Sequence, residues 1–332
     1  MLACKSTRWL HVTAPPPLDK RCDSGAANPI ARGKQVRWMA GQTRSDVRIV
    51  VLWAIALFAI TAVGMAPLFY YRLDLSTLSF STPMPVIVGI GIELTAYAPT
   101  LAALLVTGVI SAAGGFKRLL RPVLRWRVGP QWYVIALLGP SLLFMVGDAL
   151  RYIAGADVPS QWLTIPSAPE ATFLIGALIA GSFGEELGWR GLGQPRLQSR
   201  YGALGAAVVV GALWSLWHLW PAVAPGGAET TTVTDVILTF GRLIATSIVY
   251  AWLLNSTGSL WIVMLAHAGH NLAVRFVPFS TSIQHGDPVT TILYAIVAAV
   301  VVGFAGARWL SRQRDYPQPS SGGHFPSHER MT

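Results

Sequence analysis

Long uninterrupted apolar runs are the feature that most limits what this chain can fold into. A helix needs about 20 apolar residues to cross a hydrocarbon core of about 30 Å, because each residue adds about 1.5 Å. Of the 332 residues, 53% are hydrophobic and only 12% are charged, whereas an ordinary soluble domain has about 25% charged residues. We therefore predict an all-α, polytopic transmembrane bundle with about eight spans, located approximately at 47–71, 85–112, 131–153, 171–187, 203–222, 233–254, 260–277 and 289–310.

The distribution of Lys and Arg predicts the orientation of this bundle. Nine of them lie in 1–48, five in 116–130, three in 188–202 and four from residue 308 onward, so that 21 of the 25 occupy alternate connections. Positive residues accumulate on the cytoplasmic side of membrane proteins. Both termini are therefore predicted to be cytoplasmic. The net charge of +10 is accordingly interpreted as a topology signal and not as a surface for nucleic acid.

The two ends of the chain are polar. Residues 1–46 are rich in Pro, Gly and basic residues, and we expect a disordered cytoplasmic tail there, with a second disordered tail at 311–332. A start codon assigned too far upstream is an alternative interpretation of the first segment, whereas the first apolar run is too long for a signal peptide. Both cysteines, Cys4 and Cys22, lie in this tail, so a metal in the bundle would need His and carboxylate ligands.

The connection between the second and third spans has a mixed character. Its sequence, GGFKRLLRPVLRWRVGPQWY, combines basic residues with Leu, Val and Trp. This pattern is typical of a segment that lies in the membrane interface among anionic headgroups. We expect it to anchor the protein to the lipid bilayer, and substrate docking is the second interpretation.

Two adjacent carboxylates follow an uncharged run in the fourth span. A charged side chain at the centre of a bilayer costs at least about 2.5–3.5 kcal/mol, so such residues are paired, neutralised or used. Glu186 and Arg190 are four residues apart and are predicted to pair on a helix. Glu185 points about 100° away from Glu186 and is left for chemistry.

Other ionisable residues in the spans have structural explanations. We expect Asp148 and Arg151 to pair, Asp235 to cap the start of its helix, and Arg242 to pair with another span. Glu93 is predicted to make a hydrogen-bonded helix contact in preference to a catalytic one.

Three spans carry polar residues that are predicted to converge. Trp214 lies one helical turn before His218 in the fifth span, and His267 lies one turn before Asn271 in the seventh. Without partners, each of these polar groups would cost several kcal/mol in lipid. Together with Glu185 they can satisfy one another around a water molecule or a metal ion.

Two kinds of chemistry are open to this cluster. In peptide hydrolysis, Glu185 and His218 would form the general-base pair, and His267 and Asn271 would donate hydrogen bonds to the oxyanion. Alternatively, Glu185, His218 and His267 would bind Zn²⁺, the two-His, one-carboxylate set of hydrolytic zinc sites. The sequence has no HExxH motif, and both interpretations stay open.

The motifs in these three spans resemble those of a known family. The EELGWRG segment at 185–191, the aromatic-xxx-His element ending at His218 and the His-xxx-Asn element ending at Asn271 resemble the CPBP family over about 171–275. This family groups CAAX prenyl proteases with bacteriocin-processing and immunity membrane proteins (Abi). The resemblance implies a helical intramembrane protease.

The resemblance also implies roles for individual residues. Glu185 would activate water with His218 as its partner, while His267 and Asn271 would stabilise the oxyanion or act as ligands. The pair formed by Glu186 and Arg190 would support the site. Trp214 departs from the Phe that is usual in the family, and it keeps an aromatic packing face. His270 is not part of the motif and is interpreted as structural.

We therefore predict an intramembrane endopeptidase, similar to CAAX proteases, that hydrolyses a peptide bond of a membrane-bound or lipidated protein near the cytoplasmic face. Its expected location is a prokaryotic plasma membrane, which it crosses several times, and no nucleic acid partner is expected. The alternatives are a transporter or proton pathway that uses the same buried Glu and His, and a non-catalytic membrane scaffold.

Overall fold

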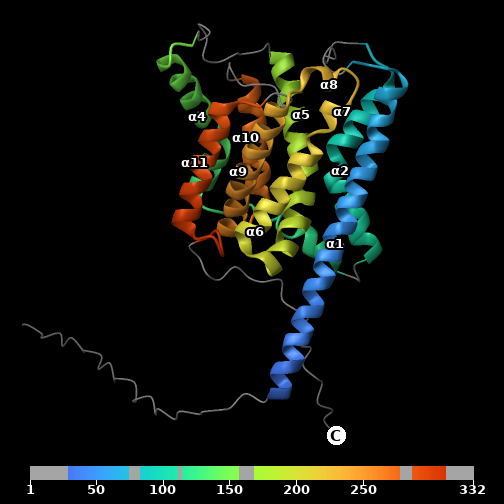
Figure 1. The fold of residues 1–332 in the computed structure, drawn as a ribbon, viewed down its shortest axis with the longest axis vertical. Helices are drawn as coiled ribbons and strands as arrows, with labels where there is room; N and C mark the ends of the chain where they lie inside the picture. The colour runs from blue at the N-terminus through green and yellow to red at the C-terminus, as the bar shows by residue number, and fades with distance from the viewer. Residues whose placement is uncertain (1–28, 75–82, 111–113, 157–167, 277–285, 312–332) are drawn as a thin grey trace, which may run out of the picture. The chain divides into compact units, whose positions relative to one another are not determined.

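The structure is a computed structural model, and it describes residues 29–74, 83–110, 114–156, 168–276 and 286–311. The chain divides into two compact units, residues 1–41 and residues 42–332. Of the first unit, only the helical backbone of 29–41 is described. The second unit contains the bundle (Figure 1).

Long helices account for all eight predicted spans. The described residues contain no strand, and six stretches are long and apolar enough to cross a membrane, with Leu260–Val274 as a shorter apolar helix. The prediction of a polytopic helical membrane protein is therefore confirmed. The long helices are α1 (Pro29–Tyr70), α2 (Val86–Ile110), α4 (Pro130–Ile153), α5 (Ala168–Glu186), α6 (Gln194–Trp217), α9 (Val233–Thr257), α10 (Leu260–Phe276) and α11 (Pro288–Ala305).

The N-terminal segment differs in part from its prediction. Helix α1 begins at Pro29, so residues 29–46 are helical and not a disordered tail. The segment that follows this proline, ARGKQVRWMAGQ, contains several residues with high helix propensity, and Pro is favoured in the first turn of a helix. The predicted disorder of 1–28 and 312–332 concerns residues outside the described ranges.

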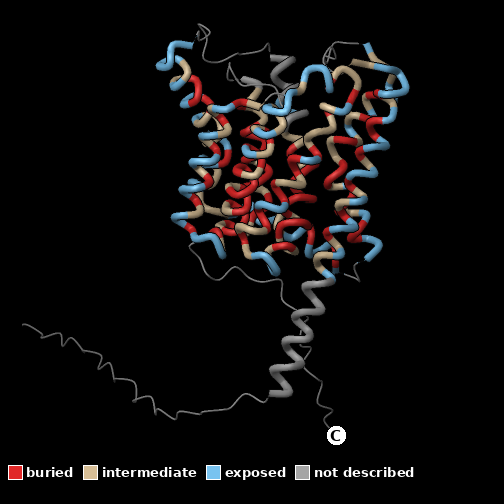
Figure 2. Tube along the Cα trace, viewed as in Figure 1, coloured by how far each residue is buried: buried red, intermediate tan, exposed pale blue. Residues whose placement is uncertain are grey.

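The helices of the second unit pack with their buried faces toward one another. Helix α9 packs against α6 and α11, α10 packs against α4 and α5, and α2 packs against α5. Buried residues lie on the facing sides of these helices (Figure 2). Apolar residues such as Val86 (79% exposed) and Val109 (77% exposed) remain on the outside of α2, as expected for a surface whose solvent is lipid.

Four short helices connect the long ones. The basic connection forms α3 (Gly115–Leu120), and a π-helical segment, η1 (Leu187–Gly193), joins α5 to α6. Helices α7 (Trp220–Val223) and α8 (Gly227–Thr230) follow α6. Since π-helical turns are rare and occur mostly at functional sites, the residues beside η1 are candidates for a functional site.

The predicted pair at the end of α4 is confirmed and has a third member. Arg151 donates a hydrogen bond of 2.8 Å to Asp148 and also bonds Asp287, which caps α11. Burial alone would raise the pKa of Asp287, but the hydrogen bonds from Arg151 and Thr290 bring this pKa below its usual value. The cluster therefore ties α4 to α11 through charged groups.

Two other structural predictions are confirmed, and a third is wrong. Asp235 forms a capping box with Thr232 at the start of α9. Arg242 on α9 reaches another span, with its Nη1 3.2 Å from Nε2 of His270 on α10. Glu93, however, is exposed on α2, and within the described residues no hydrogen bond joins it to another helix.

Helix α2 and η1 approach each other closely at Gly188. A Cβ atom at this position would lie 2.4 Å from the backbone oxygen of Pro99. The same oxygen accepts a hydrogen bond of 3.0 Å from the Trp53 indole on α1. Glycine is therefore required where three elements meet, only two residues after Glu186.

We expect Gly188→Ala to destabilise the bundle by about 1–3 kcal/mol, because the added methyl must displace backbone and not a flexible side chain. Thermal unfolding of the purified protein in detergent measures the effect. Gly181→Ala on α5 is the matched control, since nothing lies within 4 Å of its Cβ position. Equal melting temperatures for the two variants would contradict this prediction.

Candidate active site

The last turn of α5 and the π-helical segment present the buried ion pair. Arg190 donates a hydrogen bond of 3.0 Å from Nη1 to Oε1 of Glu186, and both side chains are fully buried. The predicted pairing of these two residues is confirmed. The guanidinium also lies over the rings of Trp214 and Tyr250, at 4.5 Å and 5.0 Å, so its remaining N–H groups face aromatic surfaces.

Helix α10 brings His267 to the same carboxylate. Its Nδ1 lies 2.9 Å from Oε1 of Glu186, and its Nε2 lies 3.9 Å from Oε1 of Glu185. An ionised carboxylate can only accept hydrogen bonds, so Nδ1 is the nitrogen that carries a proton. Nε2 is therefore directed toward Glu185, and in the neutral imidazole it holds the lone pair.

Two tryptophans bind the carboxylate of Glu185. The indole N–H of Trp214 on α6 donates to Oε2 over 2.8 Å, and that of Trp189 donates to the same oxygen over 3.4 Å. As predicted, Glu185 points away from the Glu186–Arg190 pair, and the two indoles are its hydrogen-bond partners. Its Oε2 is held by these neutral donors, while its Oε1 faces His267. Trp214 contributes a hydrogen bond and not only an aromatic face.

The predicted contact between Glu185 and His218 is not formed. His218 follows the end of α6, and the ring of Trp214 lies 5.6 Å from the His218 ring and 5.3 Å from the His267 ring. Within the described residues no hydrogen bond or ion pair joins His218 to Glu185 or to His267. The histidine that faces Glu185 in this structure is His267, with 3.9 Å between Nε2 and Oε1.

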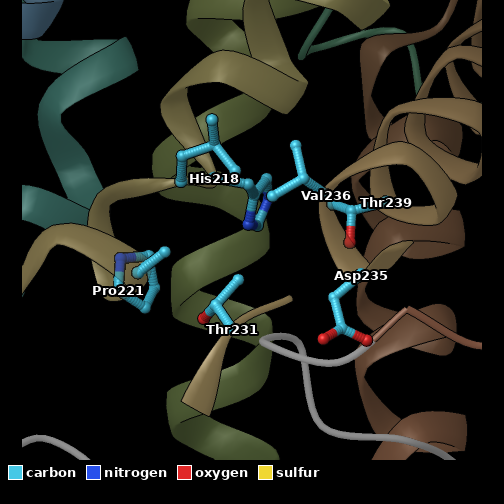
Figure 3. A pocket seen from close by; sticks show the side chains of 8 residues that line it. His218, Pro221, Thr231, Asp235, Val236 and Thr239 are labelled. Atoms are coloured by element: carbon cyan, nitrogen blue, oxygen red, sulfur yellow. The ribbon is translucent and has the colours of Figure 1, made fainter. Parts of the chain in front are cut away.

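His218 instead lines a separate small pocket of about 10 Å³, between α6, α7 and the start of α9, which is about the space that one water molecule needs. Figure 3 shows its ring pointing toward this space, beside Thr231 and Thr239. Arg196 and Arg200 lie in the first part of α6, before its kink at Gly202, whereas His218 is the C-cap of the same helix. The pocket therefore lies near the opposite end of α6 from those basic residues. The site thus extends away from the predicted cytoplasmic side.

Asn271 lies one turn beyond His267 on α10. Its Nδ2 donates a hydrogen bond of 3.1 Å to Oγ of Ser182, which lies one turn before Glu185 on α5. The side chains of α5 and α10 therefore meet at two successive levels. The oxyanion roles of His267 and Asn271 remain predictions.

The sequence-based reasoning missed four residues around the site. Trp189 and Tyr250 contact its charged groups, Ser182 binds Asn271, and Trp53 packs edge-on against Trp189 with ring centroids 5.0 Å apart. The positions of Trp189 and Ser182, four residues after and three residues before Glu185, were a usable signal. Tyr250 and Trp53 lie on other helices, and nothing in the sequence placed them here.

The predicted zinc ligands do not fit a shared metal ion. Within the described ranges, no three His, Cys, Asp or Glu side chains converge at metal-binding distances. The Trp214 indole donates a hydrogen bond to one oxygen of Glu185, and the Trp214 ring packs against the rings of both His267 and His218. Glu185, His218 and His267 are therefore not arranged to hold one metal ion in this structure.

The fold and this cluster define a class of protein: a multi-pass helical membrane protein that holds two adjacent glutamates, an arginine and a histidine in its interior. Residues 167–273 match the model of the type II CAAX prenyl endopeptidase Rce1-like family. The chain is also 27% identical over 131 residues to CAAX prenyl protease 2 of the archaeon Methanococcus maripaludis, a match that covers 38% of this chain and 47% of the relative.

These two matches confirm the resemblance to the CAAX protease (CPBP) family that was predicted from the three motifs. All three motifs lie within the matched segment 167–273. The matched part spans about half the length of the curated relative.

We expect Glu186→Ala to destabilise the protein by about 3–5 kcal/mol, because it leaves Arg190 as an uncompensated buried charge. Glu185→Ala should cost less, since it removes a buried charge and leaves only neutral indole donors without an acceptor. Thermal unfolding in one detergent provides the comparison. The reverse order of stabilities would show that Glu186 does not hold this site together.

Proposed function

We propose that this protein is an intramembrane endopeptidase that hydrolyses a peptide bond of a membrane-associated protein. The observation that carries the proposal is the pair formed by Glu185 Oε1 and His267 Nε2, which face each other 3.9 Å apart in the interior of the bundle. The matching family model and the name of the curated relative support the same reaction class.

The separation of this pair suits a bridging water. A distance of 3.9 Å is too long for a direct hydrogen bond, but an oxygen about 2.8 Å from each atom would bridge the two groups. Glu186 holds His267 with its proton on Nδ1, which leaves Nε2 to receive a proton from that water. This arrangement follows the logic by which a carboxylate orients a catalytic histidine.

The reaction then needs only groups of this chain. The bridging water, oriented by Glu185 and deprotonated at His267, adds its oxygen to the carbonyl carbon of the substrate. The imidazolium of His267 returns the proton to the leaving amide nitrogen, and the C–N bond breaks to give an acid and an amine. The second N–H of the Asn271 amide, beyond the one that binds Ser182, would donate to the oxyanion.

This scheme modifies the predicted division of roles. Glu185 keeps the task of activating water, but its partner is His267 in place of His218. His218 faces the neighbouring pocket, so we assign it to binding the substrate beside the scissile bond. A membrane-associated peptide or protein is the proposed substrate class.

We expect Glu185→Gln to reduce kcat/KM at least about 10³-fold while the melting temperature stays close to that of the wild type. Gln keeps an oxygen that can accept the indole hydrogen bonds but carries no charge to orient the water. Cleavage of a fluorogenic lipopeptide in detergent or liposomes measures the loss. Full activity in this variant would remove the proposed mechanism.

We expect zinc chelators to leave this activity unchanged, because the three candidate ligands do not converge. The measurement compares peptide cleavage before and after dialysis against 1,10-phenanthroline, with the non-chelating 1,7 isomer as the control. Loss of activity that added Zn²⁺ restores would show that the working enzyme rearranges around a metal.

A further inference from the structure

The basic connection between α2 and α4 has no part in the proposed reaction. Its five cations are all exposed, and they are Lys117, Arg118, Arg121, Arg125 and Arg127. The chain has no Asp or Glu between Glu93 and Asp148. Within the described residues, no ion pair joins any of the five cations to a carboxylate. The segment 115–127 therefore presents a concentrated positive charge to its surroundings.

Large apolar side chains are exposed among these cations. The exposed fractions are 47% for Phe116, 42% for Leu120, 75% for Leu124 and 56% for Trp126. The guanidinium of Arg127 also lies over the Trp126 ring, 4.9 Å from its centroid. Water is an unfavourable neighbour for such apolar groups, whereas the headgroup region of a bilayer accommodates apolar side chains and cations together. A lipid surface therefore fits this segment better than a soluble acidic partner does.

The position of the segment agrees with a lipid surface. It joins the end of α2 to the start of α4, and both helices are long and apolar enough to cross a membrane. Figure 1 shows it at the end of the bundle opposite to α7 and α8. Arg118 lies within electrostatic range of Arg196, in a connection that is predicted to be cytoplasmic. Clusters of about four to eight Lys or Arg residues beside a cytoplasmic helix end attract anionic phospholipid headgroups.

The inner face of the same segment contacts both elements that carry the proposed catalytic pair. A Cβ atom at Gly191 of η1 would lie 3.3 Å from Cδ1 of Leu119 on α3 and 3.4 Å from Cδ2 of Leu260 on α10. The backbone N–H of Leu260 donates a hydrogen bond of 3.0 Å to the carbonyl oxygen of Pro122. The segment 115–127 is thus joined to η1, which directly follows Glu186, and to the first residue of the helix that carries His267.

The geometry points to residues 115–127 as a binding surface for the headgroups of anionic phospholipids, which hold α3 against η1 and α10 and thereby promote cleavage. The 3.9 Å between Oε1 of Glu185 and Nε2 of His267 depends on how the α5–η1 segment and α10 are placed relative to each other. The lipid site is independent of the proposed function, whereas its effect on cleavage rests on that function. This inference goes beyond the predicted anchoring, because it connects a bound lipid to the active site.

The first test compares cleavage in vesicles of phosphatidylcholine alone and in vesicles that also contain phosphatidylglycerol. The substrate is a fluorogenic peptide of zero net charge. We expect cleavage to be at least about 5-fold faster in the anionic vesicles, since one cation near an anionic surface contributes a factor of about 5 in binding. High salt should reduce the difference, because it screens exposed charges.

Variants of the exposed cations locate the effect on this protein surface. The triple variant Arg118→Gln, Arg121→Gln, Arg127→Gln should lose most of the stimulation, while the matched triple variant with Lys at the same positions should keep most of it. Arg125 stays unchanged, because its Nη1 packs against the turn at Gly258. Comparing variants in the same vesicles removes any contribution of the vesicle to substrate concentration or surface pH.

A binding measurement separates the lipid site from the proposed reaction. Short-chain phosphatidylglycerol or phosphatidylcholine is titrated into Glu185→Gln protein in detergent, and the melting temperature is measured, because a ligand of the folded state raises it. We expect phosphatidylglycerol to raise it more than phosphatidylcholine does, except in the triple Gln variant. This result without any cleavage of peptide would overturn the proposed function and the effect on cleavage, while the lipid site would stand.

The connection to the active site is tested at Leu119, which is 4% exposed. Leu119→Ala should keep the phosphatidylglycerol-dependent rise in melting temperature but lose the stimulation of cleavage, because the contact with η1 is shortened. Leu119→Val should lose part of the stimulation, and it serves as the test if the alanine variant does not fold. Leu120→Ala, at an exposed neighbouring position, is the control that should match the wild type.

Three results would overturn the inference. Equal cleavage by the wild type in both kinds of vesicle would show that anionic lipid does not act on the site. Equal stimulation of the wild type and the triple Gln variant would assign the lipid effect to another surface. A rise in melting temperature with a polyglutamate peptide as large as that with phosphatidylglycerol would show a surface for acidic protein segments instead.

Discussion

The buried carboxylate of Glu186 is the group on which the rest of the site depends. It accepts hydrogen bonds from Arg190 within its own chain segment and from His267 on α10, both at Oε1. An uncompensated charge in the interior of the bundle would destabilise the fold. Glu186, Arg190 and His267 therefore depend on one another for their stability. The same contacts join α10 to the α5–η1 segment and determine which nitrogen of His267 carries the proton. The hydrogen bonds to Glu186 therefore contribute to the stability of the bundle and also set the orientation of His267.

The two adjacent glutamates have different surroundings although they are neighbours in the sequence. Glu186 is balanced by a cation, whereas Glu185 is held by the neutral N–H groups of Trp214 and Trp189. Neutral donors orient a carboxylate without cancelling its charge. In the proposed reaction Glu185 would orient the water, while Glu186 positions Arg190 and His267. A Phe at position 214 would leave this carboxylate with one indole donor fewer.

The sequence predicted the parts of this structure that depend on local spacing. Apolar runs located all eight long helices, and separations of three or four residues predicted the Asp148–Arg151 and Glu186–Arg190 pairs. Periodicity gives the face of a helix but not the side chain that it meets. For this reason the contact between Trp214 and Glu185, 29 residues apart, was missed. The sequence placed His218 at the same depth as Glu185, and no hydrogen bond or ion pair joins the two within the described residues, because the predicted spans gave no measure of relative depth.

A polar atom without a hydrogen-bond partner is more costly inside a membrane protein than on the surface of a soluble protein. In water, an unpaired hydroxyl or guanidinium is hydrated at little cost, but a bundle surrounded by lipid offers no such alternative. The Tyr250 hydroxyl and Nε2 of His218 are two such buried atoms, and neither has a hydrogen-bond partner within the described residues. Because buried polar atoms in native proteins are almost always satisfied, a water molecule or a bound substrate is needed to complete this part of the bundle.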